Sequence, residues 1–414
     1  MITIVTAPSK YQPGNAAIFK VSSDRDAILQ FKVTIFDQAT DEVMSTQKYA
    51  TLPMFPTGTT FDLAPLILSF VDFELNTQDG IIAQVTKPFR CYYIQVLELY
   101  RDADTQEIVE GDSLFSPDNY YLWLAQIDTV SFNNYNSERY VPTPAGVPSI
   151  FLNNKPLSVK TYYDSVQYLY FMTSIVSKVV IKCYRRPNIL TATKYIGVTE
   201  NKMYRVDVSP ASLFEEYGPD LFRLESEFTD PFDPPFGSPD NAEDSAYYTV
   251  EIQDESGNTL SEVRTYIFVH KPCIDTLDLV FSNDLGGYDS AVFRPYKQSV
   301  TVQRGNIEAN PWQLDSTGNL LRAINGIFNP SSAIISVTKD STFSIVSDVL
   351  NDEYSYYLKD IVESKNVLVR LSTGDMFPIE IQETTYDINK RKYNTNNGRA
   401  TLNFKIHDTA LKLI

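Results

Sequence analysis

The chain has very few of the residues that enzymes use for acid, base and metal chemistry. Only 2 of its 414 residues are histidine and 3 are cysteine. His270 and His407 have no metal ligands at fixed spacing around them, so we expect structural or surface roles for both. Cys91, Cys183 and Cys273 form no CxxC pair, which argues against a zinc site or a disulfide framework. We expect them to be small buried residues in a protein made in a reducing compartment.

Motifs that hold a phosphate or activate a nucleophile are also missing. Gly286-Gly287 is accompanied by neither a GxGxxG pattern nor a Walker lysine, so a tight turn between two strands is the favoured interpretation. No nucleophile elbow supports Ser-His-Asp catalysis, and no two carboxylates stand out as a glycosidase pair. Acidic residues gather between Asp230 and Asp244, but their spacing matches no EF-hand loop. We therefore expect no enzymatic activity, no cofactor and no metal.

Long apolar runs and excess positive charge are absent as well. No segment approaches the roughly 18 apolar residues of a membrane span. The segment Met1 to Pro8 lacks a basic leader and a long apolar core, so no membrane span and no cleaved export signal are expected. Acidic residues outnumber basic ones by 52 to 35, for a formal net charge of −17. That balance argues against specific nucleic-acid binding, because phosphate contacts draw on clustered Lys and Arg.

Aromatic residues and prolines are plentiful. The chain has 27 Tyr, 24 Phe and 23 Pro, and its hydrophobic residues reach 43%. Tyr, Phe, Val, Ile and Thr favour strands, and frequent prolines favour turns between them. Leu29 to Phe36 alternates apolar and polar residues, which is the period of a half-buried strand. The composition predicts a globular, mainly β protein.

Two stretches 145 residues apart have nearly the same local pattern. Phe61-Asp62-Leu63-Ala64-Pro65 recurs as Val206-Asp207-Val208-Ser209-Pro210, each followed by a leucine three residues on. Tyr92 to Glu98 likewise parallels Tyr247 to Gln253. Each proline should end a strand and open a short helix, with Ser209 as the N-cap of the second. The repeat predicts an internal duplication, which is typical of spacers and scaffolds.

The prolines also suggest where domains end. Val141 to Pro148 holds three prolines and a glycine, which favours a semi-rigid connector. We predict a β-sandwich-like domain at 1–143, a second at 149–271 with a proline-rich insertion at 230–240, and a smaller α+β domain at 272–414. Within the last, residues 347 to 364 have apolar side chains at helical spacing and predict one amphipathic helix.

Several turn and strand patterns are spread over all three predicted domains: Pro8 to Asn15 with Ile18 to Asp24, Phe61 to Pro65, Phe281 to Ser290, and Ser364 to Val369 with Gly374 and Phe377 to Ile379. These segments resemble the virion structural proteins of tailed phages of Bacteroides-like bacteria, the crAss-like phages and their relatives. The resemblance implies a tail, neck or baseplate protein that assembles into a ring or another symmetric oligomer.

The function predicted is accordingly structural. The chain should act in the virion by self-association and by contact with other phage proteins, after assembly in the host cytoplasm. The candidate interface residues are Pro231, Phe232, Pro234, Pro235 and Phe236 in the insertion, and Lys390, Arg391 and Lys392 in a basic loop. The alternative is a carbohydrate-binding or adhesive surface protein, for which tandem sandwiches rich in aromatics would also serve.

Overall fold

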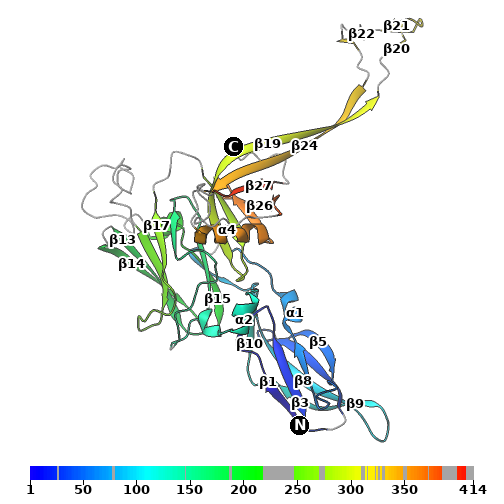
Figure 1. Ribbon diagram of the computed structural model, residues 1–414, viewed down its shortest axis with the longest axis vertical. Coiled ribbons are helices and arrows are strands. Elements are labelled where there is room, and N and C mark those ends of the chain that lie inside the picture. Colours follow the sequence, from blue (N-terminus) through cyan, green and yellow to red (C-terminus); the bar gives the residue numbers. More distant parts are fainter. Residues whose placement is uncertain are drawn as a thin grey trace. The chain divides into compact units, whose positions relative to one another are not determined.

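The structure is a computed structural model of the chain. The structure describes residues 1–25, 28–76, 80–144, 146–185, 189–217, 247–269, 276–308, 313–314, 316–321, 323–324, 327–328, 332–347, 352–371, 373–384 and 399–406. Strands dominate, as the composition predicts (Figure 1). The chain divides into two compact units: one holds 1–273, 280–291 and 356–365, and the other holds the remaining residues. The predicted boundary near residues 143–149 falls inside the first unit, and the three-domain division stays a prediction.

The first sandwich lies at the N-terminal end of the chain and is built from two sheets. The larger follows the order β2-β10-β8-β4-β5, with β9 also paired to β8, and the smaller follows β1-β3-β6. Phe19 and Phe61 of the small sheet pack into one core with Phe31 and Ile94 of the large sheet. The strands are β1 (Ile2–Thr6), β2 (Tyr11–Pro13), β3 (Ile18–Ser23), β4 (Ile28–Asp37), β5 (Val43–Ala50), β6 (Gly58–Asp62), β8 (Phe89–Arg101), β9 (Ile108–Phe115) and β10 (Tyr120–Trp123).

The second sandwich has a five-stranded sheet in the order β11-β17-β16-β13-β14 and a three-stranded sheet in the order β12-β15-β7. The Tyr248 hydroxyl donates to the Val208 carbonyl at 2.6 Å, which joins the large sheet to the end of β15. The strands are β7 (Ile82–Val85), β11 (Ser158–Thr161), β12 (Tyr168–Thr173), β13 (Ser177–Arg185), β14 (Ile189–Val198), β15 (Lys202–Asp207), β16 (Tyr247–Gln253) and β17 (Arg264–Phe268).

The two large sheets share one topology. In each, the edge strand that comes first in the chain pairs in parallel with the strand that comes last in the chain (β2 with β10, β11 with β17). The other neighbouring strands are antiparallel. The aspartate that ends β6 or β15 in the small sheet also makes the same contact in both: Asp62 Oδ1 accepts from Ala64 N at 3.0 Å, and Asp207 Oδ1 accepts from Ser209 N at 2.9 Å. Helices then begin, α1 (Ala64–Ile67) in one and α3 (Pro210–Tyr217) in the other. A duplication predicts these shared features of the two sandwiches. That the two arose from one ancestral module is our inference.

The structure corrects one detail of the repeat by a single residue. Tyr93 pairs with Phe36 across β8 and β4, and their rings stack with centroids 5.0 Å apart; Tyr247 pairs with Tyr184 across β16 and β13, and their rings stack at 4.8 Å. Tyr92 and Tyr247 therefore point to opposite faces of their sheets. Tyr93 shares the outward stacking of Tyr247, and the buried Tyr92, paired with Tyr120, resembles the buried Tyr248, paired with Tyr266. A slip of one residue exchanges the two faces of a strand, so the buried positions fix the alignment where letters alone do not.

Strand β7 ties the two sandwiches together. It comes from the first half of the chain but forms the edge of the small sheet of the second sandwich, paired to β15. The buried Arg205 side chain of β15 donates to the Gly80 carbonyl at 2.9 Å, just before β7. The connector is anchored too, because the Ser174 hydroxyl donates to the Pro142 carbonyl.

The C-terminal part is α+β, as predicted. Six strands form a closed barrel in the order β18-β19-β24-β27-β26-β25. Helix α4 (Asp352–Glu363) matches the predicted amphipathic helix and buries Tyr357, Leu358 and Ile361. No helix among the described residues is long and apolar enough to cross a membrane. The barrel strands are β18 (Leu277–Ser282), β19 (Tyr288–Glu308), β24 (Ser332–Ser347), β25 (Val367–Arg370), β26 (Met376–Ile381) and β27 (Thr401–Lys405).

Candidate functional site

The residues predicted as interface from the sequence lie outside the described part of the chain. This holds for Pro231, Phe232, Pro234, Pro235 and Phe236, and for Lys390, Arg391 and Lys392. It holds equally for His270, His407, Cys273 and the acidic insertion. Their roles stay predictions. Among the residues described, no three or more His, Cys, Asp and Glu side chains gather in a way that could hold a metal ion.

The two described cysteines differ in exposure. Cys183 is buried in β13, and burial raises the pKa of its thiol to about 12. Cys91 in β8 is half-buried, and burial raises the pKa of its thiol as well. A thiol with a raised pKa is a poor nucleophile, because the thiolate is the reactive form.

A buried polar network surrounds the turn between β18 and β19. Asp289 is fully buried, and its Oδ2 accepts from Asn283 Nδ2 at 2.9 Å and from Asn154 N at 3.2 Å. Lys155 Nζ, also buried, donates to Gln167 Oε1 at 2.7 Å and to Ser290 Oγ at 3.0 Å. Most polar groups of this network hydrogen-bond to one another or to the backbone. Such a network holds a loop in one conformation.

Asp360 of α4 belongs to the same network. Its Oδ2 accepts from Asn154 Nδ2 at 2.8 Å, and its side chain is buried. The pKa of the Asp360 carboxyl is raised to about 7, chiefly by burial and also by the neighbouring Asp284 and Asp289, although the hydrogen bond from Asn154 lowers it. The Asn154 hydrogen bond joins α4 to the turn between β18 and β19 through this carboxyl.

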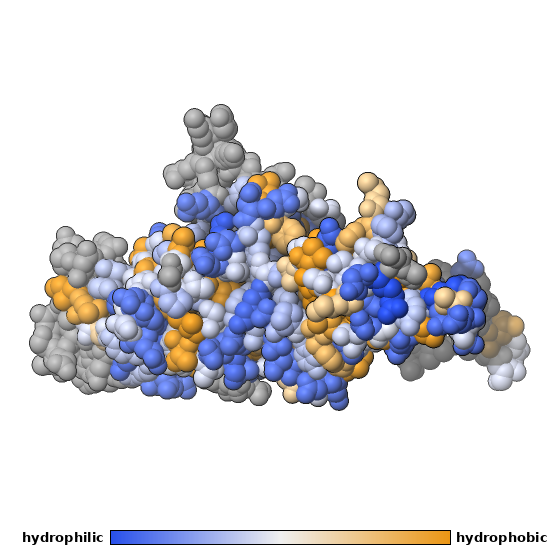
Figure 2. Space-filling view, turned by 90° about the horizontal axis from the view of Figure 1, so that it is seen from below, coloured by the Kyte–Doolittle hydropathy of each residue, from blue (hydrophilic) through white to orange (hydrophobic). Residues whose placement is uncertain are grey.

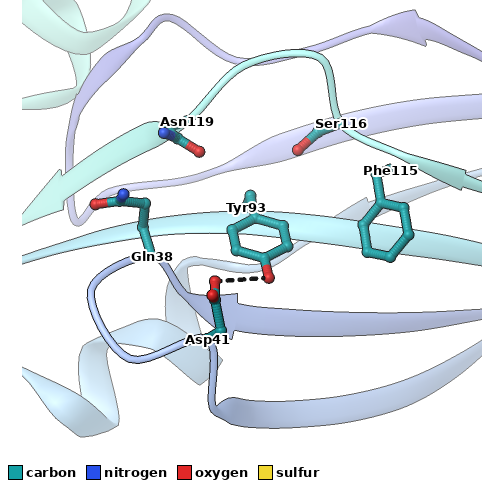
Figure 3. A pocket seen from close by; sticks show the side chains of 6 residues that line it. All are labelled: Gln38, Asp41, Tyr93, Phe115, Ser116 and Asn119. Atoms are coloured by element: carbon teal, nitrogen blue, oxygen red, sulfur yellow. Dashed lines mark hydrogen bonds between the residues drawn. The ribbon is translucent and has the colours of Figure 1, made fainter.

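An open hollow lies on the outward face of the large sheet of the first sandwich (Figure 3). We call it the Tyr93 hollow; its volume is about 400 Å³ and it is lined by Gln38, Asp41, Tyr93, Phe115, Ser116 and Asn119. The neighbouring Ile94 points into the core, so Tyr93 points outward. The Tyr93 hydroxyl donates to Asp41 Oδ1 at 3.1 Å. Loss of solvent contact and this bond raise the pKa of the Tyr93 phenol, which keeps its proton.

Two aromatic rings, Tyr93 and Phe115, form the floor of the hollow, and a third, Phe36, packs against them. The Phe36 ring stacks on Tyr93, and the Phe115 ring lies 6.1 Å from Tyr93 and 6.2 Å from Phe36, centroid to centroid. Phe115 keeps 51% of its surface exposed. Phe115 therefore presents apolar surface to solvent at the hollow.

A second surface is the long ribbon formed by β19 and β24. These strands leave the barrel and continue as a two-stranded hairpin (Figure 1). Among the described strands, β24 pairs with β27 only over Thr342–Val346, so Ser332–Ser341 pair with β19 alone. We use the name outer ribbon for 300–308 and 332–341.

The outer ribbon is amphipathic. Val300, Val302 and Arg304 alternate along β19, and they face Ser341, Lys339 and Val337 across the ladder. From Thr301 to Gly305 the opposite face carries Thr301, Gln303 and Gly305 with Asp340, Thr338 and Ser336. Beyond the bulge after Gly305 this separation ends, because Ile307 continues the same face and is 53% exposed. Val300 is 54% exposed and Val337 is 53% exposed. On the face drawn in Figure 2, by comparison, hydrophobic residues lie in separate patches among hydrophilic ones.

Sequence reasoning missed both surfaces. The alternation from Val300 to Arg304 is a readable strand signal, but a pattern of apolar and polar residues says nothing about whether the apolar face is covered. The Tyr93 hollow combines a turn, a strand and a loop that are distant in the sequence, so no local pattern indicates it.

Comparisons with known proteins identify no family. No family model matches the chain, and no curated protein matches it. Among solved structures, it is similar to the Bacillus anthracis TIE protein at 6% identity, covering 83% of this chain and 51% of that one with a TM-score of 0.16. It is also similar to dimeric latent PorU from Porphyromonas gingivalis at 10% identity, covering 83% and 31% with a TM-score of 0.17. The chain thus spans about half or less of these proteins, and likeness at this level carries no argument.

Proposed function

We propose that the protein is a non-enzymatic building block of a tailed-phage virion, in its tail, neck or baseplate, and that it works by associating with other copies of itself and with neighbouring virion proteins. The resemblance of its turn and strand segments to virion structural proteins supports the virion assignment. The observation that carries the association is the outer ribbon, with its uncovered apolar face.

An isolated two-stranded ribbon is marginally stable in water, because it has no third layer to bury its side chains. The outer ribbon nevertheless extends over nine ladder pairs with its valines in solvent. A ribbon of this kind gains stability when its apolar face packs on another surface. It is therefore suited to be an assembly arm.

Charge favours another copy of the chain as the partner. Residues 292–347, which contain the ribbon, carry five basic and three acidic residues, although the whole chain is acidic. The remaining residues carry 30 basic and 49 acidic side chains, a formal net charge of −19. Arg304 and Lys339 lie on the apolar face itself. Opposite potentials bring such surfaces together and suppress wrong partners.

The contact would be head to tail, since the arm of one copy packs on the body of the next. A head-to-tail contact closes into a ring when the rotation between copies permits it. A ring is what the resemblance to phage tail and neck proteins implies.

The test is the mass of the assembled protein, measured by native mass spectrometry and light scattering. The wild-type chain should form a defined oligomer. Val302→Asp with Val337→Asp should shift it to monomer, because both carboxylates would have to be buried in the interface. The matched control is Gln303→Asp with Thr338→Asp, which adds the same charge to the polar face and should leave the oligomer intact.

A wild-type chain that stays monomeric alone and with the proteins of its neighbouring genes would overturn the proposal, as would equal loss of assembly in both double variants. The virion assignment is tested separately, by whether the neighbouring genes encode portal, tape-measure or other tail proteins.

A further inference from the structure

The Tyr93 hollow has features that the assembly function does not use. It lies on the first sandwich, and its floor and its rim differ chemically: the floor is aromatic, whereas the rim carries amide, carboxylate and hydroxyl groups (Figure 3). We propose that this hollow binds a neutral saccharide, with a pyranose ring lying over the Tyr93 and Phe115 side chains.

The rim supplies hydrogen-bonding groups that the fold itself leaves unused. The Gln38 and Asn119 side chains make no hydrogen bond within the described part of the chain, although both line the hollow. A side-chain amide both donates and accepts, which matches the dual character of a sugar hydroxyl. Asp41 keeps one carboxylate oxygen beyond the one that accepts from Tyr93.

The hollow is also held in shape before any ligand arrives. Asp37 Oδ1 accepts from Ala39 N at 2.8 Å, and Gln38 N donates to the Cys91 carbonyl at 3.0 Å, which fixes the turn after β4. On the other side, Ser116 Oγ accepts from Ile94 N at 3.1 Å and donates to the Asp118 carbonyl at 3.1 Å. Both walls are thus tied to the rigid strand β8, and little conformational entropy is lost on binding.

Size and charge narrow the ligand class. A volume of about 400 Å³ suits one or two sugar rings. Aromatic rings pack on the apolar C–H face of a pyranose, while the amides reach its hydroxyls. Asp41 repels acidic sugars, so the ligand should be neutral. The hollow by itself fits a protein partner less well, because a stable protein interface buries roughly 800 Å² on each side, more than six lining residues provide.

The experiment is saturation-transfer NMR of the full chain with four neutral disaccharides, cellobiose, maltose, lactose and diacetylchitobiose, and with digalacturonic acid. At least one neutral sugar should bind with a dissociation constant of about 1 mM, as expected for an open site with few hydrogen bonds. Asn119→Ala should weaken binding roughly fivefold, the loss of about one hydrogen bond, and Tyr93→Ala should abolish it.

Tyr247→Ala is the control, because Tyr247 is the equivalent stacked ring of the second sandwich and lies outside the hollow. It should leave sugar binding unchanged. Asn119 is exposed, so its replacement leaves the fold intact even if Tyr93→Ala disturbs it. Absence of binding by all four neutral sugars, equal binding of digalacturonic acid, or binding insensitive to Asn119→Ala would each overturn the proposal. The result is independent of whether the protein assembles.

Discussion

At the scale of the residue, single backbone and side-chain environments have consequences that can be measured. The turn between β18 and β19 is the clearest case. The sequence predicts a tight turn at Gly286-Gly287, and the structure has one: Asn283 N donates to the Gly287 carbonyl at 3.0 Å. Gly286 has φ +88, which side-chain-bearing residues rarely adopt.

Gly286→Ala should destabilise the protein severely, because the added Cβ would lie 2.2 Å from the Leu124 carbonyl oxygen. Gly257 has φ +91 and open space around the same position. Gly257→Ala therefore incurs only the backbone strain, about 1 kcal/mol, and Gly286→Ala should cost at least about 2 kcal/mol more. Urea unfolding measures both; equal costs would contradict the close approach to Leu124.

Asp360 should make stability depend on pH. The pKa of the Asp360 carboxyl is about 7 in the folded chain and 3.8 in the unfolded chain, so the folded state holds the proton more tightly. Stability from this group is full below about pH 4 and is lost as the pH rises through 7. Asp360→Asn should remove this dependence and raise the free energy of unfolding at pH 8 by roughly 1 to 3 kcal/mol. Urea titrations at pH 5 and pH 8 provide the measurement, and an unchanged pH slope would contradict it.

At the scale of the element, the four-residue strand β7 connects the two sandwiches. It lies between β6 and β8 of the first sandwich in the chain but pairs with β15, so this ladder joins a segment of the first half of the chain to the second sandwich. Asp207 N donates to the Ile81 carbonyl at 2.6 Å, and Ala83 faces Arg205 two residues further along. Hydrogen-bonded pairs alternate in an antiparallel ladder, so the Ala83 N–H points at β15 and the Gln84 N–H points away from it.

Ala83→Pro should therefore uncouple the two sandwiches. Proline at 83 removes a ladder bond, whereas proline at the exposed Gln84 leaves the ladder intact. In the wild-type chain, amide exchange in β4 and β13 should report one shared unfolding step as urea rises. Ala83→Pro should split it into two steps and Gln84→Pro should not. Two separate steps in the wild-type chain would show that β7 does not couple them.

At the scale of the whole molecule, uneven charge is the main physical theme. The residues 292–347, which contain the outer ribbon, are mildly basic, whereas the rest of the chain is strongly acidic. In the self-association proposed above, this difference would direct the contact without a uniformly apolar surface. The same acidity discourages nonspecific nucleic-acid binding. The molecule is also modular. Its two sandwiches have large sheets of the same topology but different outward-facing residues.

The sequence predicted those parts of the fold that depend on local pattern. Period-2 alternation indicated Leu29 to Phe36, found as part of β4, and helical spacing indicated α4. It did not indicate fully buried strands such as β12 and β18, because every residue of these is buried and no alternation survives. The outer ribbon does alternate, but the sequence did not indicate it as a ribbon. Its length depends on pairing between β19 and β24, which are distant in the sequence.

The sequence by itself thus determined the class of protein: mainly β, acidic, repeated in pattern and poor in groups for chemistry. Only the tertiary structure decided where the surfaces lie. The Tyr93 hollow needs Gln38, Tyr93 and Asn119 brought together from three parts of the chain, and the face of the outer ribbon depends on cross-strand register. Local patterns follow from short-range sterics and solvation, whereas surfaces are made by contacts between distant residues, which no local pattern encodes.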